Sequence, residues 1–165
     1  MTVKNDASIA WPAGFEPGKA YVHAHNEMLI PAEAPVCFAW LCRATLWPTW
    51  YSNCGGFKFD TATGPDLTPG TVFTWNTFGA PVHSTVRRFE PPLHLEWDAT
   101  AFGIRAYHGW VIVPQGDQCQ VITEETQIGP VPFFLRWYLN GMLHRGHQIW
   151  LEGLKTATVR GLPPL

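Results

Sequence analysis

The stretch AYHGWVIVPQGDQCQVITEET, residues 106–126, decides the fold. Two runs rich in Val, Ile, Thr, Tyr and Trp flank a turn at Gly116. This pattern is typical of two antiparallel strands joined as a hairpin. Successive side chains of a strand point to opposite faces, so the stretch also raises the question of which face carries His108 and Glu125.

The same pattern continues on both sides of this hairpin. Turn signals with Gly or Pro divide residues 57–128 into six runs, and residues 21–30 form a further strand-like run. Short turns between consecutive strands favour antiparallel pairing. The six runs are GFKFD, TVFTWN, VHSTVRRF, LHLEWDA, RAYHGWVIV and CQVITEETQI.

Three segments predict helices. PAEAPVCFAWLC begins with proline, as short helices often do, and a second helical turn is expected near residues 47–51. Between residues 131 and 159, apolar side chains and a histidine recur at helical spacing, at Leu139, Leu143, His147, Trp150, Leu151 and Leu154. The sequence therefore predicts an α+β domain: a curved seven-stranded antiparallel sheet wrapped around a long C-terminal helix, with two short helices after strand 1.

Length and composition indicate one folded unit. The chain has 165 residues, enough for one core. Residues 1–20 lack periodicity and predict an N-terminal arm that either docks through Trp11 and Phe15 or stays loose. Residues 21–160 form the domain, and residues 161–165 form a tail.

Charge and cysteine usage exclude several function classes. A net charge of −2 with 15% charged residues offers no footprint for nucleic acid. The apolar runs are far shorter than the ~20 residues of a membrane-spanning helix, so no membrane insertion is expected. The four cysteines lack CxxC spacing and no secretory signal precedes them, which predicts a cytoplasmic protein with reduced thiols. The sequence leaves both a monomer and a homodimer open. There is no Gly-rich phosphate loop, and no cofactor is expected.

The aromatic content predicts a cavity. Nine tryptophans and ten phenylalanines are many for a compact core, because large rings are often partly accessible or line concave surfaces. One helix cannot fill a seven-stranded sheet. The space between helix and sheet is therefore the expected site for a hydrophobic small molecule.

Several motifs occur in order across residues 21–158: IPAEAPVCFAWL, WPTWY, GTVFTW, HSTVRRFEPPLHLEW, AYHGW, VITEETQIG and HQIWLEGLK. They resemble the START-like superfamily (SRPBCC, helix-grip fold), and within it the polyketide cyclase/dehydrase-like group. The resemblance implies a single START-like ligand-binding domain at residues 21–160. Members of the superfamily include cyclases, aromatases and lipid carriers, and no catalytic residue is common to them all.

Strand parity predicts which side chains face the cavity. In LHLEWDA the apolar set includes Trp97 and faces inward. A two-residue turn at residues 103–104 would pair Trp97 with Trp110 and Ala99 with His108, which places both His108 and Trp110 inward.

The next turn extends this assignment to the following strand. A turn centred on Gly116 would pair Trp110 with Val121 and His108 with Thr123. Glu125 would then be a diagonal neighbour of His108 on the inner face, ~7 to 8 Å away at Cα. Glu124 would face the opposite side.

These registers define a candidate site. His108 and Glu125 are the candidate catalytic pair, and the ligand-binding candidates are Trp75, Ser84, Trp97, Trp110, Thr123, Leu143 and His147. A register shifted by one would bring His83, Arg87 and Tyr107 inward instead. Arg87 and Arg88 are adjacent and are expected to face opposite ways.

Two interpretations of His108 and Glu125 stay open. An imidazole beside a carboxylate can act as a general acid or base, which fits the cyclisation or dehydration chemistry of the resembling cyclases. The other interpretation is a core histidine bonded to Thr123 and an inert carboxylate at the cavity mouth. His144 and His147 form an HxxH pair without a convincing third ligand, so no metal site is expected.

The function expected from the sequence is binding of an aromatic or polycyclic molecule, with cyclisation or dehydration as its possible chemistry. A non-catalytic carrier or sensor of a lipid-like ligand is the first alternative. A protein-interaction module like the chaperone activators of this fold is the second.

Overall fold

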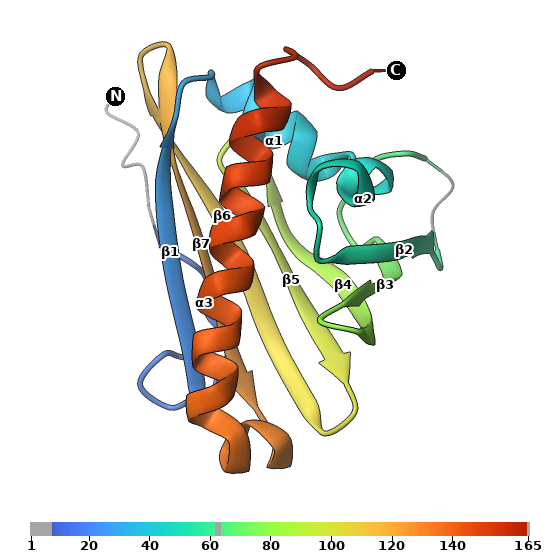
Figure 1. Cartoon of the computed structure of the whole chain (residues 1–165), viewed down its shortest axis with the longest axis vertical. Coiled ribbons are helices and arrows are strands. Elements are labelled where there is room, and N and C mark those ends of the chain that lie inside the picture. The colour runs from blue at the N-terminus through green and yellow to red at the C-terminus, as the bar shows by residue number, and fades with distance from the viewer. Residues whose placement is uncertain (1–7, 62–63, 165) are drawn as a thin grey trace.

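The computed structural model describes residues 8–61 and 64–164. Its sheet is antiparallel and seven-stranded, as the sequence predicts, and the strand order is β1-β7-β6-β5-β4-β3-β2 (Figure 1). The strands are β1 (Val22–Ile30), β2 (Cys54–Phe59), β3 (Val72–Thr77), β4 (Ala80–Glu90), β5 (His94–Ala101), β6 (Ile104–Gln115) and β7 (Gln118–Ile128).

The helices lie on one face of this sheet. The long helix α3 (Pro130–Thr158) runs along the sheet, and the short helices α1 (Ala34–Cys42) and α2 (Trp47–Trp50) lie beside its C-terminal half (Figure 1). A single 3-10 turn (Ala44–Leu46) joins α1 and α2. No helix among the described residues is both long and apolar enough to cross a membrane. The fold class predicted from the sequence is confirmed.

The aromatic core fills the end of the sheet that α1 and α2 cover. Trp47 is fully buried, and its ring is the centre of the cluster. Five other rings lie with centroids 5.3 to 5.9 Å from it, those of Phe57, Phe73, Trp75, Trp97 and Trp150. Edge-on and tilted ring pairs of this kind add to the stability that apolar burial provides.

The two predicted registers around β6 are wrong by two residues. Trp97 pairs with His108, and His108 pairs with Glu125. The turn before β6 is Phe102–Gly103, since Ala101 pairs with Ile104. A shift of two residues leaves every side chain on its predicted face, so the inward assignment of His108 and Glu125 still holds.

A β-bulge in β4 corrects a second expectation. The β4–β5 register shifts between Val86 and Arg88, so that Arg87 has no partner in the ladder. Arg87 forms an ion pair with Asp98, and Arg88 one with Glu96, so the two arginines share the outer face. A bulge inserts one residue and reverses the parity beyond it.

The N-terminal arm docks on the outer face of the sheet. Ile9 and Phe15 are buried there against Tyr107 and Val111, with Trp11 packed at the edge of the same cluster. Strand β6 leaves space for the side chain of Ile9 because residue 109 is glycine, and a Cβ at this position would lie 2.4 Å from Ile9 Cδ1. Of the two expected states of the arm, the docked one is present at Ile9, Trp11 and Phe15, whereas residues 1–7 lie outside the described residues.

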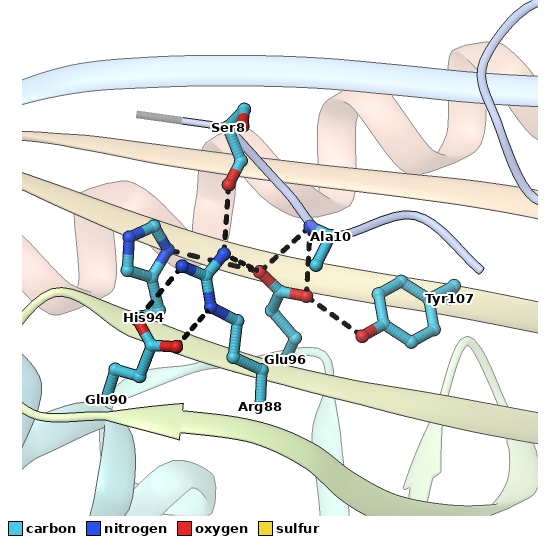
Figure 2. A network of polar contacts seen from close by, with 7 residues as sticks. All are labelled: Ser8, Ala10, Arg88, Glu90, His94, Glu96 and Tyr107. Carbon is cyan, nitrogen blue, oxygen red and sulfur yellow. Dashed lines mark hydrogen bonds and ion pairs between the residues drawn. The ribbon is translucent and has the colours of Figure 1, made fainter. Parts of the chain in front are cut away.

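Beneath the arm lies a buried carboxylate that the sequence did not predict (Figure 2). Glu96 is fully buried and accepts hydrogen bonds from Arg88 Nη1 (3.2 Å), Tyr107 Oη (2.9 Å) and the Ala10 backbone N–H (3.3 Å to each oxygen). The side chain of Glu96 points outward, but the arm removes it from solvent.

Candidate functional site

A cavity of about 170 Å³ lies between α3 and the concave face of the sheet. Most of its wall is apolar and comes from β3 to β6 and from α3. Its large apolar lining residues include Trp75, Val82, Trp97, Leu139, Leu143 and Trp150. A mostly apolar pocket with a few converging polar groups is the usual form of a small-molecule site.

One carboxylate and two imidazoles converge on the wall of this cavity. His108 on β6 lies directly opposite Glu125 on β7, and its Nδ1 is 3.5 Å from Glu125 Oε2. His147 on α3 reaches the same oxygen through Nε2 at 3.3 Å. The two imidazole rings are stacked, with centroids 4.8 Å apart. We call His108, Glu125 and His147 the HEH cluster.

Two neighbours orient the HEH cluster from behind. A 2.7 Å hydrogen bond joins His108 Nε2 to Thr123 Oγ1. Gln127 Nε2 donates to Glu125 Oε1 at 2.7 Å. His108 Nε2 and Glu125 Oε1 are thus occupied, which leaves His108 Nδ1 and Glu125 Oε2 for contacts within the cluster.

Burial and mutual contacts shift the pKa values of the cluster. Burial, followed by the nearby His147 ring, lowers the pKa of His108 to about 3. Burial also acts to raise the pKa of Glu125, but the hydrogen bond with His147 and the two imidazoles outweigh it, so this pKa lies below its ordinary value. At neutral pH the site therefore holds a neutral His108 and an ionised Glu125.

The predicted site residues divide into three groups. His108, Glu125, His147, Trp75, Trp97 and Leu143 line the cavity. Thr123 and Trp110 are buried beside the HEH cluster, where Thr123 bonds His108 and the Trp110 ring stacks on it. Ser84 is buried but does not line the cavity, and it accepts a hydrogen bond from Trp75 Nε1 at 3.3 Å.

The alternative register is wrong. Tyr107 contacts the docked arm, Arg87 pairs with Asp98, and His83 bonds Thr74 in an exposed position, all on the outer face. Glu124 also lies on that face, as expected, where it pairs with His23 at 2.7 Å.

Sequence reasoning missed several residues of the cavity. Gln127, Tyr51, Phe78 and Trp150 line it. Trp150 could have been found, because it shares the helix face of His147, and Gln127 follows Glu125 by two residues on one strand. Phe78 gave no signal: it comes from the β3–β4 turn, where its φ of 52° is unusual for a residue other than glycine.

The HxxH pair of α3 does not act as a unit. His144 Nδ1 bonds Asn26 Oδ1 at 3.1 Å, whereas His147 turns to Glu125. Within residues 8–61 and 64–164, the one group of three side chains with the spacing of metal ligands is the HEH cluster, whose ligand atoms all lie within 4.8 Å of one another.

No protein-family model matches the sequence, and neither does any curated protein. Solved structures do match it. A hypothetical protein from Helicobacter pylori is 28% identical, with a TM-score of 0.83, over 94% of this chain and 98% of its own.

Two further structures have functional names. Zhui aromatase/cyclase from a Streptomyces species is 13% identical, with a TM-score of 0.69, over 84% of this chain and 93% of its own. Norcoclaurine synthase from Thalictrum flavum, in complex with dopamine and hydroxybenzaldehyde, is 14% identical, with a TM-score of 0.64, over 86% of this chain and 88% of its own. At such identities they show that this chain shares their fold, and the fold alone.

Proposed function

We propose that the protein binds a compact aromatic molecule in the cavity between α3 and the sheet and transfers protons on it through the HEH cluster. The observation that carries the proposal is the convergence of two imidazoles and one ionised carboxylate on the wall of a mostly apolar cavity.

The volume of the cavity limits the ligand. A cavity of ~150 Å³ lined by apolar side chains holds benzene, and this one measures about 170 Å³. We infer a ligand with a single ring and small substituents rather than a polycyclic one. Its burial would provide roughly 25 cal/mol per Å² of apolar surface before the costs of association.

The cluster has the parts of an acid–base catalyst. Glu125, ionised and held by Gln127, can accept a proton from a carbon next to a carbonyl group. His147, 3.3 Å from Glu125 Oε2, can pass a proton to a ligand oxygen or receive one from Glu125. Such transfers form and consume enols, which is the chemistry that cyclisation and dehydration require. The aromatic walls would fix the orientation of the ring.

The structural neighbours support this chemistry without establishing it. One is named an aromatase/cyclase, and a further neighbour is a di-domain ARO/CYC of the steffimycin biosynthetic pathway. The norcoclaurine synthase structure contains dopamine and hydroxybenzaldehyde, which are single-ring compounds.

Binding is tested first, by titration calorimetry of hydroxybenzaldehyde and acetophenone into protein treated with EDTA. Ala99→Leu fills the cavity and should weaken binding at least tenfold, whereas Ala20→Leu, outside the cavity, should leave it unchanged. Equal binding to both variants would contradict the proposed location.

Turnover is then tested by NMR, as exchange of the acetophenone methyl protons with solvent deuterium. Loss of a general base costs typically 10²- to 10⁴-fold, so Glu125→Gln should slow the exchange to that extent while retaining binding. Binding without any exchange would favour the non-catalytic carrier instead.

A further inference from the structure

We propose that the HEH cluster is a binding site for one divalent transition-metal ion of the zinc class. The inference deepens the proposed function. It rests on that function only in that the free coordination positions of the ion would face the cavity that holds the ligand.

The spacing of the three facing atoms suits a small cation. Glu125 Oε2 lies 3.5 Å from His108 Nδ1 and 3.3 Å from His147 Nε2. Two ligands bound to zinc at ~2.0 to 2.1 Å with a tetrahedral angle between them lie ~3.4 Å apart. Even if the two nitrogens have the full separation of 4.8 Å, a point ~2.4 Å from all three atoms exists, although the nitrogens then lie on opposite sides of the ion. A movement of ~0.7 Å by each imidazole would bring them to the tetrahedral separation of ~3.4 Å.

The donor set is the one that transition metals take. Two imidazole nitrogens and one carboxylate oxygen bind zinc in several hydrolases and iron(II) in many oxygenases, with the remaining positions open to water or substrate. Magnesium and calcium prefer oxygen ligands, and a site with two imidazoles disfavours them.

The neighbours of the cluster orient it as the second layer of a metal site does. Gln127 holds Glu125 Oε1 and leaves Oε2 free. The hydroxyl of Thr123, which both donates and accepts, can bond His108 Nε2 in either tautomer, including the one whose Nδ1 lone pair faces the cluster. Outer partners of this kind typically contribute 10- to 100-fold to metal affinity.

A cation would also balance the charge of the site. The side chain of Glu125 is only 13% exposed. No lysine or arginine of residues 8–61 and 64–164 forms an ion pair with it, and the imidazoles are its only such partners there. A buried carboxylate needs a positively charged partner or a metal ion to offset its lost hydration.

Metal binding and the proposed proton transfer use the same atoms. An ion would occupy the lone pairs of both imidazoles, so the metal-bound and the proton-transferring forms are alternative states of one cluster. In the metal-bound form, the open positions can polarise an oxygen of the cavity ligand.

The experiment is a titration of EDTA-stripped protein with cobalt(II), followed by displacement with zinc. We expect one ion per chain, with the visible absorption of a four- or five-coordinate cobalt site. Glu125→Gln and His147→Gln should each weaken cobalt binding at least 100-fold, and Gln127→Leu should weaken it 10- to 100-fold.

The matched control is Glu124→Gln, on the opposite face of the same strand, where Glu124 contacts His23 and His25. This variant should bind cobalt as the wild type does. Loss of the ion in Glu124→Gln, or its retention in Glu125→Gln, would place it on the surface and overturn the proposal, as would the absence of stoichiometric binding.

Two further measurements distinguish misfolding of a variant, failure of the metal proposal and failure of the proposed ligand binding. The unfolding midpoint of each variant in EDTA shows whether it is folded, and only folded variants are compared. Binding of hydroxybenzaldehyde in EDTA tests the proposed function without the ion, so either proposal can fail while the other stands.

Discussion

Replacement of Arg88 by methionine tests whether Glu96 is an ionised carboxylate sealed under the arm. The side chain of Glu96 is 0% exposed, and Arg88 is its only fully charged partner among the described residues (Figure 2). Methionine retains the apolar part of Arg88 but removes its charge. The carboxylate would keep the hydrogen bonds from Tyr107 and Ala10 and would lose its counter-ion.

The expected cost is large for a substitution at a strand surface. Removing one partner of a buried ion pair typically costs 3 to 5 kcal/mol, because the other charge stays buried. The bonds of Arg88 to Glu90, whose side chain is 56% exposed, add at most about 1 kcal/mol. We therefore expect Arg88→Met to lower the free energy of unfolding by about 3 to 6 kcal/mol, a large part of the 5 to 15 kcal/mol typical of a domain.

The assay is urea unfolding at pH 7, with a double-mutant cycle. Glu96→Leu combined with Arg88→Met removes both charges and should recover most of the loss, because an apolar replacement of a buried pair is often nearly neutral. Arg87→Met is the control. The side chain of Arg87 is 55% exposed and that of its partner Asp98 is 35% exposed, so the free energy of unfolding should change by less than about 1 kcal/mol. Equal effects of the two arginines, or no recovery in the double variant, would refute a sealed carboxylate.

Three further predictions follow from burial and close contacts. In EDTA, the free energy of unfolding should fall by roughly 2 to 3 kcal/mol from pH 7 to 4.5, because unfolded His108 takes up a proton below its pKa of ~6.5 whereas folded His108, with a pKa of about 3, stays neutral. The urea midpoints of the wild type and His108→Gln should therefore converge at low pH. Parallel curves would contradict this prediction. Gly153→Ala should destabilise the fold by about 1 to 3 kcal/mol, because the Cβ of alanine would lie 2.2 Å from the backbone carbonyl oxygen of Trp50. Thermal melts measure this loss, and an unchanged melting midpoint would show that α3 can shift. Gly109→Ala should instead release the arm, because the Cβ of alanine would meet the side chain of Ile9. Limited proteolysis should then cleave the arm faster, while the melting midpoint of the domain changes little. Cleavage as slow as in the wild type would mean that the arm adjusts in place.

The fold was predictable because its signals are periodic. Alternation in residues 57–128 gave the strands, and helical spacing in residues 131–159 gave α3. The inward positions of His108 and Glu125 survived a misplaced turn, because both register errors were of two residues and parity repeats every two. Pairing partners depend on where a turn begins, which alternation alone does not define.

What the sequence did not reveal depends on contacts between distant segments. The bulge between Val86 and Arg88 breaks the alternation without a glycine to mark it. Helical spacing predicts that His147 faces the cavity, but its approach to Glu125 depends on the rotation of α3 against β7. Burial of Glu96 depends on the arm, whose Ala10 lies 86 residues earlier in the chain.

One strand connects the arm to the candidate site. Seven consecutive residues of β6, from position 106 to position 112, are buried, although a strand with one solvated face would alternate. Tyr107 holds Glu96 under the arm, and the next residue, His108, contacts Glu125 inside the cavity. Within this buried run the outer positions are Tyr107, Gly109 and Val111, none of which is charged, and this is the sequence signal of a covered face. Because the HEH cluster requires side chains placed within fractions of an ångström, covering β6 on both faces restricts the motion of the strand that carries His108. We therefore regard the docked arm as part of the structure that positions the candidate site.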